Sequence, residues 1–96
     1  MVFYTTAGGS GRSLMRARRV VKQMQIEDSE NTYLCPFIAL SYLAGSPLSF
    51  DDKMTLRLDL MCICDEVVVV GDDITEEVER ELDFADSIGM AVRYID

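Results

Sequence analysis

A glycine-rich stretch between a predicted strand and a predicted helix is the first place where this sequence could carry chemistry. Val2 to Thr6 alternates apolar and β-branched residues, and residues 7–13 then read Ala-Gly-Gly-Ser-Gly-Arg-Ser. Glycines let the backbone approach an anion closely, while exposed N–H groups and the helix dipole attract it. We therefore expect an anion site, or alternatively a flexible loop before a solvated basic helix. The expected site residues are Gly8, Gly9, Ser10, Gly11, Arg12 and Arg16.

A second stretch that could carry chemistry is the acidic loop after Val67–Val70. Gly71 ends this β-branched run, which is typical of a strand buried on both faces. Asp72 and Asp73 then offer two carboxylates, and Asp73 or Thr75 can cap the helix that follows. We expect Thr75 to contribute to the ligand site.

The elements that position the acidic loop form a predicted βαβ unit at the end of the chain. Val78, Leu82 and Ala85 recur at i, i+4 and i+7, which gives the helix one buried face. Gly89 stands where a helix C′ residue belongs, and Ala91–Ile95 supplies the next strand. A strand, a crossover helix and a second strand imply parallel pairing.

Four further segments are predicted in the first part of the chain. A helix is expected from about Leu14 to Gln25, and a strand over Thr32–Cys35 that stops at Pro36. Phe37–Leu43 is apolar and predicts either a short helix or a buried loop. The last helix in this part is expected over Phe50–Met61.

This last helix carries its own start signal, although its pattern is ambiguous. Ser49 and Asp52 resemble a capping box, with Asp in place of the usual Glu. Met54, Leu56, Leu58 and Leu60 alternate as in a strand. Length and cap favour the helix.

These elements alternate as β-α-β-α-β-α-β within one domain, residues 1–96. Right-handed crossovers predict a small doubly wound α/β fold, a three-layer sandwich whose four-stranded parallel sheet has the order 2-1-3-4. Ligands of such sheets bind beyond the carboxyl ends of the strands, where the strand order reverses. The loops at 8–12 and 71–75 should therefore face each other. A basic wall opposite an acidic wall suits a ligand with a phosphate at one end.

Composition and charge exclude several classes of function. The 96 residues carry a net charge of −8, yet the first 26 residues contain five basic side chains and no acidic one. The overall field opposes phosphates, so direct binding of duplex DNA is not expected. Three cysteines without histidine argue against a metal site, and we expect Cys62 and Cys64 to be small buried residues and no cofactor to be needed. No apolar run can span a bilayer and no signal peptide is evident, so we expect a cytoplasmic protein without membrane contact.

The chain resembles the nucleoside 2-deoxyribosyltransferase-like superfamily, especially its small bacterial and phage branch. The resemblance covers roughly the last third of the chain, and the glycine-rich loop is similar to the phosphate loop of the 5′-monophosphate N-glycosidases in that superfamily. The residues that carry it are Cys64 to Asp72, Ile74-Thr75, Glu81 to Ala85, and Gly89 to Ile95.

The resemblance implies a site that binds a nucleoside or nucleotide and acts on its N-glycosidic bond. Glu81 would match the nucleophilic carboxylate that attacks the anomeric carbon, and Asp72 or Asp73 an acid that handles the sugar or the leaving base. The sequence differs from its relatives at Glu77, where a glycine is usual, and at Phe37, where a histidine usually follows the proline.

Two functions without chemistry are alternatives. Residues 72–86 hold eight acids against the single Arg80, and such a helix can mimic nucleic-acid phosphates and occupy the basic groove of a nuclease or DNA-binding partner, as a phage-type inhibitor would. Its expected contacts are Glu76, Glu79, Asp83 and Asp86. The other alternative is a nucleotide sensor that binds through Gly8–Arg12. An exposed edge strand, at Ala91–Ile95 or Thr32–Cys35, would allow a homodimer.

Overall fold

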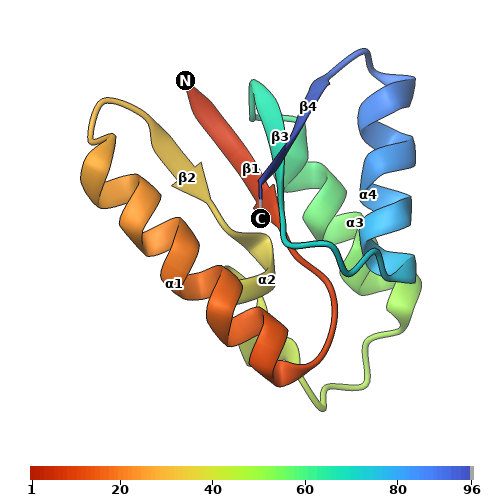
Figure 1. The fold of residues 1–96 in the computed structure, drawn as a ribbon. Helices are drawn as coiled ribbons and strands as arrows, with labels where there is room; N and C mark the ends of the chain where they lie inside the picture. The colour runs from red at the N-terminus through yellow and green to blue at the C-terminus, as the bar shows by residue number, and fades with distance from the viewer. Residues whose placement is uncertain (96) are drawn as a thin grey trace.

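The computed structural model describes residues 1–95 as a parallel sheet between helices (Figure 1). The sheet has the order β2-β1-β3-β4, and every neighbouring pair is parallel, which confirms the predicted α/β class and strand order. In chain order the elements are β1 (Val2–Thr6), α1 (Gly11–Glu27), β2 (Thr32–Leu34), α2 (Pro36–Ala39), the 3₁₀ helix η1 (Ser41–Leu43), α3 (Phe50–Met61), β3 (Glu66–Val70), α4 (Glu76–Ser87) and β4 (Ala91–Ile95).

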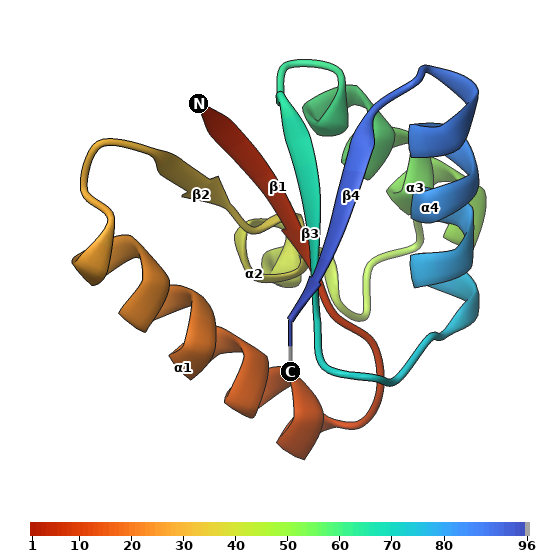
Figure 2. The same cartoon turned by 45° about the horizontal axis from the view of Figure 1, so that its top comes forward.

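Helices cover both faces of the sheet, with α1 on one side and α3 and α4 on the other (Figure 2). Alternate residues of each strand point to opposite faces, so the central strands β1 and β3 feed two separate apolar clusters. The α1 side includes Phe3, Ala17, Val21, Val68 and Val70. The other side includes Tyr4, Met61, Val67, Val69 and Val78. This burial on both faces is why β3 is an unbroken run of valines.

The start of the central strand pair is fixed by Asp65. Its carboxylate accepts a hydrogen bond from the Val2 N–H at 2.7 Å, and its own N–H donates to the Val2 carbonyl, also at 2.7 Å. Both bonds tie the residue before β3 to the first residue of β1. The register of the two strands that carry the site is therefore set at their amino ends.

Helix α1 is longer than the predicted Leu14–Gln25. Ser10 has an extended backbone and its carbonyl accepts the Leu14 N–H at 3.0 Å, so the helix begins at Gly11. Gly11 and Arg12 thus belong to the first helical turn, and the loop itself is reduced to residues 7–10. The sequence placed the boundary too late because glycine is a poor helix former.

The segment after β2 forms short helices and is only partly buried, so of the two predicted alternatives the short helix is correct and the buried loop is wrong. Cys35 is the N-cap of α2 and not the last residue of the strand, and Pro36 occupies the first helical position, where its missing N–H costs nothing. One short α-helix and one 3₁₀ turn then lead to the glycine at position 45. This segment lies beyond the carboxyl ends of the strands (Figure 1).

The residues at 50–61 form a helix, so the strand alternative is wrong. Ser49 Oγ accepts the Asp52 N–H at 3.0 Å, and the Asp52 carboxylate accepts the Ser49 N–H at 3.2 Å. The predicted capping box is therefore complete with Asp in the third position. Met54 and Met61 are the buried residues of this helix.

Removal of this cap should be measurable. We expect Ser49→Ala to lower the free energy of unfolding by about 1 kcal/mol, because the Asp52 N–H loses its acceptor at the helix start. Urea denaturation at neutral pH measures the difference. Thr55→Ala is the matched control, since its exposed hydroxyl bonds only to the Asp51 carbonyl within the helix. Equal losses in the two variants would show that the capping box does not stabilise α3.

Three remaining expectations have mixed outcomes. Cys64 is buried, as expected, but Cys62 is exposed, because it follows the last turn of α3 on the solvent side. None of the helices in residues 1–95 is long and apolar enough to cross a membrane. Strands β2 and β4 form the two edges of the sheet, and the prediction of a homodimer stays untested.

Candidate functional site

Three neighbouring cavities lie at the carboxyl edge of the sheet. The loop cavity, about 370 Å³, lies between the β1–α1 and β3–α4 loops. It shares Gly8 with the middle cavity, about 130 Å³. The Lys53 cavity, about 260 Å³, shares Phe37, Arg57 and Glu77 with the middle cavity. We call the middle and Lys53 cavities together the cleft.

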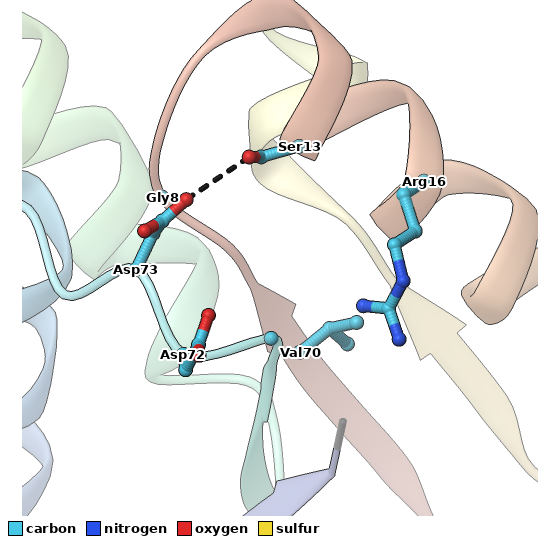
Figure 3. A pocket seen from close by; sticks show the side chains of 7 residues that line it. Gly8, Ser13, Arg16, Val70, Asp72 and Asp73 are labelled. Atoms are coloured by element: carbon cyan, nitrogen blue, oxygen red, sulfur yellow. Dashed lines mark hydrogen bonds between the residues drawn. The ribbon is translucent and has the colours of Figure 1, made fainter.

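The loop cavity brings together residues of the two predicted loops. Asp72 and Asp73 enter it from the β3–α4 loop, whereas Gly8, Ser13 and Arg16 enter it from the other side (Figure 3). Ser13 Oγ donates a hydrogen bond to Asp73 Oδ2 at 2.9 Å. The two loops therefore face each other at the switch point between β1 and β3, as the strand order requires.

Close packing explains the two glycines at the start of the loop. A Cβ at Gly8 would lie 2.4 Å from the Asp73 carbonyl oxygen, and one at Gly9 would lie 2.4 Å from Asp73 Oδ2. Gly9 also has φ +101°, which disfavours any side chain. The Asp73 carboxylate thus fills part of the space in which we expected a phosphate.

The predicted anion-binding residues are divided among different cavities. Gly8 and Arg16 line the loop cavity, while Gly9 and Thr75 line the middle cavity. Thr75 also caps α4 by accepting the Val78 N–H at 3.5 Å, so Asp73 is not the cap. The other three, Ser10, Gly11 and Arg12, are exposed and line neither cavity.

Glu81 is the most unusual residue of the molecule, because its carboxylate is buried with only 1% of the residue exposed. It occupies the i+3 position of the buried stripe that Val78 begins on α4, where an apolar residue would be ordinary. The Tyr4 hydroxyl donates to its Oε2, and the Thr6 hydroxyl donates to its Oε1 at 2.8 Å. Arg57 Nη1 lies 3.5 Å from the same Oε1.

The surroundings of Glu81 raise its pKa. Burial raises the pKa of Glu81 above its ordinary value, and the nearby Glu77 adds to the increase. The hydroxyls of Tyr4 and Thr6 and the Arg57 guanidinium act in the opposite direction. Burial, together with Glu81, also raises the pKa of Tyr4, so the phenol stays a hydrogen-bond donor.

The raised pKa of Glu81 predicts a pH-dependent stability. The folded protein retains a proton at Glu81 at pH values where the unfolded chain, with an ordinary pKa of 4.5, has lost it. Stability from this group is complete below the unfolded pKa and is lost as pH rises through the folded pKa. Urea denaturation between pH 4.5 and neutral should show wild type losing stability relative to Glu81→Gln, which does not titrate. A constant difference would contradict the raised pKa.

Arg57 connects Glu81 to the cleft. Its side chain is 22% exposed and lines both the middle cavity and the Lys53 cavity. Neither of these cavities nor the loop cavity is lined by Glu81 itself. Glu81 therefore lies behind Arg57, while Asp72 and Asp73 line the loop cavity on the far side of Gly8.

Sequence reasoning missed the partners of Glu81. Tyr4 and Thr6 are two residues apart on β1 and so share a face, which was available from the alternation of the strand. Arg57 had no comparable signal, because its contact depends on how α3 packs beside α4. Glu81 could also have been a solvated surface acid of a charged helix, but it is buried, and its position within the buried stripe of α4 was the clue.

The acids that we expected to contact a protein partner lie on the exposed side of α4. Glu76, Glu79, Asp83 and Asp86 are all exposed. Arg80 lies among them and pairs with Asp51 at 2.8 Å and with Glu76 at 3.8 Å. Within residues 1–95, acidic, cysteine and histidine side chains form no group of three that could hold a metal ion.

Comparisons of the chain with models of protein families, with curated proteins and with solved structures find no match. The resemblance to deoxyribosyltransferase-like proteins therefore stays a prediction from the motifs.

Proposed function

We propose that the protein binds a nucleoside or nucleotide in the cleft and cleaves or transfers at its N-glycosidic bond through Glu81. The observation that carries the proposal is the buried Glu81 carboxylate, held by Tyr4 and Thr6 behind the arginine that lines the cleft. A buried carboxylate costs several kcal/mol unless its surroundings compensate for lost water. Such groups concentrate at sites that perform chemistry.

The reaction assigns a role to each group. Arg57 would turn from Glu81 toward the ligand, and the ionised Glu81 would attack the anomeric carbon as its bond to the base nitrogen breaks. The departing base takes a proton from an acid in the cleft. Water or a second base then displaces Glu81 and restores its carboxylate, and the proton lost by this nucleophile returns to the acid of the first step.

For the acid that protonates the base, the structure offers a better candidate than the aspartates expected from the sequence. Glu77 lines both parts of the cleft, whereas Asp72 and Asp73 line the loop cavity. Glu77 stands one helical turn before Glu81 and is only partly buried. We therefore assign proton transfer to Glu77 and not to Asp72 or Asp73.

Two measurements test this function. Calorimetric titration with deoxynucleosides and their 5′-monophosphates should detect binding, and chromatography should detect free base after incubation. Glu81→Gln keeps the size and the acceptor oxygen of the side chain, so we expect it to bind but to lose at least about a hundredfold in rate. No binding by the wild type would refute the function, and an unchanged rate in Glu81→Gln would remove Glu81 from the mechanism.

A second function follows from a different surface. We propose, as the alternative, that the exposed acids of α4 bind the basic groove of a partner protein. The supporting observation is that four carboxylates on this helix are exposed and only Arg80 lies among them. Glu79→Lys with Asp83→Lys should abolish a salt-sensitive interaction in a low-salt capture from lysate. Arg18→Glu, on α1, is the control.

A further inference from the structure

We propose that the anionic group of the ligand binds to Lys53 and Arg57 in the Lys53 cavity, and not to the glycine-rich loop. The inference rests on the proposed function and deepens it, because it orients the ligand in the cleft. It also identifies the ligand as phosphorylated or otherwise anionic.

Two cations of α3 line the same cavity. Lys53 and Arg57 are four residues apart, so they lie one above the other on the helix surface. Arg57 contacts Glu81, but Lys53 forms no ion pair with any of residues 1–95. Like charges at this spacing repel each other, and an anion between them would relieve the repulsion. A phosphate could accept hydrogen bonds from both side chains.

The charges at the two ends of the site favour this orientation. The loop cavity is lined by one cation, Arg16, and by two carboxylates, those of Asp72 and Asp73. The Lys53 cavity is lined by two cations, Lys53 and Arg57, and by one acid, Glu77. An anion in the loop cavity would also approach the Asp73 carboxylate packed against Gly9.

The remaining walls of the Lys53 cavity define the rest of the ligand. Phe37, Leu40 and Leu43 give an apolar wall with one aromatic ring, and Ser41 adds a hydroxyl. Glu77, at the junction with the middle cavity, can accept a hydrogen bond from a hydroxyl or amino group. A phosphorylated nucleoside carries all three features, namely a ring, hydroxyl groups and an anion.

The test compares each deoxynucleoside with its 5′-monophosphate in three proteins. For wild type, calorimetry should show the monophosphate binding at least about tenfold more tightly than the nucleoside. Lys53→Gln should remove this preference and leave nucleoside affinity unchanged. Arg16→Gln, which removes the cation of the loop cavity, should leave both affinities unchanged.

The opposite pattern would overturn the inference while the proposed function stands. If Arg16→Gln removes the phosphate preference and Lys53→Gln does not, the anion binds at the loop. If neither compound binds to wild type, the proposed function fails. Titration of the wild-type protein with inorganic pyrophosphate then tests the anion site by itself. If pyrophosphate shifts the amide NMR signals of residues 53 and 57 in wild type but not in Lys53→Gln, the anion site is supported. If it shifts neither signal in wild type, the anion site is refuted.

Discussion

Glu81→Ala is expected to lower the free energy of unfolding by about 3 kcal/mol or more. The change leaves the buried hydroxyls of Tyr4 and Thr6 without their acceptor, and each unsatisfied buried group costs about 1–3 kcal/mol. It also leaves a cavity behind the cleft, which adds to the loss. The partly exposed Arg57 can turn to water and contributes less. Urea denaturation at neutral pH measures the effect.

Two matched variants separate the causes of this loss. Glu81→Gln keeps an acceptor for the hydroxyls and removes the buried charge, so we expect a change of less than about 1 kcal/mol. Glu79→Ala removes an exposed carboxylate from the same helix, and we expect a change within about 0.5 kcal/mol. If Glu81→Ala were as mild as Glu79→Ala, the buried network would not stabilise the fold. Loss of activity in Glu81→Gln without loss of stability would separate chemistry from folding.

The second large effect is expected at Gly8. The new Cβ of Gly8→Ala would lie 2.4 Å from the Asp73 carbonyl oxygen and 2.7 Å from Thr75 Cγ2. Because one of these atoms is backbone, the β3–α4 loop must move, and we expect a loss of about 2–3 kcal/mol. The same movement should reduce ligand binding, since this loop borders both the loop cavity and the cleft.

Gly11→Ala is the control for this prediction. A Cβ at Gly11 would meet no atom within 4 Å, and the residue lies in the first turn of α1. Alanine is the better helix former, so we expect the free energy of unfolding to stay equal or to rise by up to about 1 kcal/mol. Equal and small effects at Gly8 and Gly11 would contradict the close packing of the loops.

The fold was largely predictable because local signals agreed with the global arrangement. Three local signals each specified an element that the structure contains. They are the valine run of β3, the apolar stripe of α4 and the capping box at the start of α3. The parallel order 2-1-3-4 followed from right-handed crossovers. The errors fell at Gly11 and Cys35, where caps set the boundary and the side-chain pattern is silent.

The site was predictable only in part, for a different reason. The facing of the two loops follows from strand order, so Gly8 and Asp73 were correctly placed together. The sequence could not show that Asp73 itself packs into the glycine loop, because that contact joins residues more than sixty positions apart. It also could not show which cavity the basic residues of α3 would line.

Amino-acid sequence was therefore sufficient for the class of fold, for the edge of the sheet that carries the loops, and for Glu81 as a residue of interest. Periodicity, capping and crossover handedness are properties of short segments and of chain order, and both are written in the sequence. Tertiary packing alone decided that Glu81 is buried, that Tyr4 and Thr6 hold it, and that Arg57 separates it from the cleft. Burial and the pKa it raises depend on distant neighbours, which only the folded chain brings together.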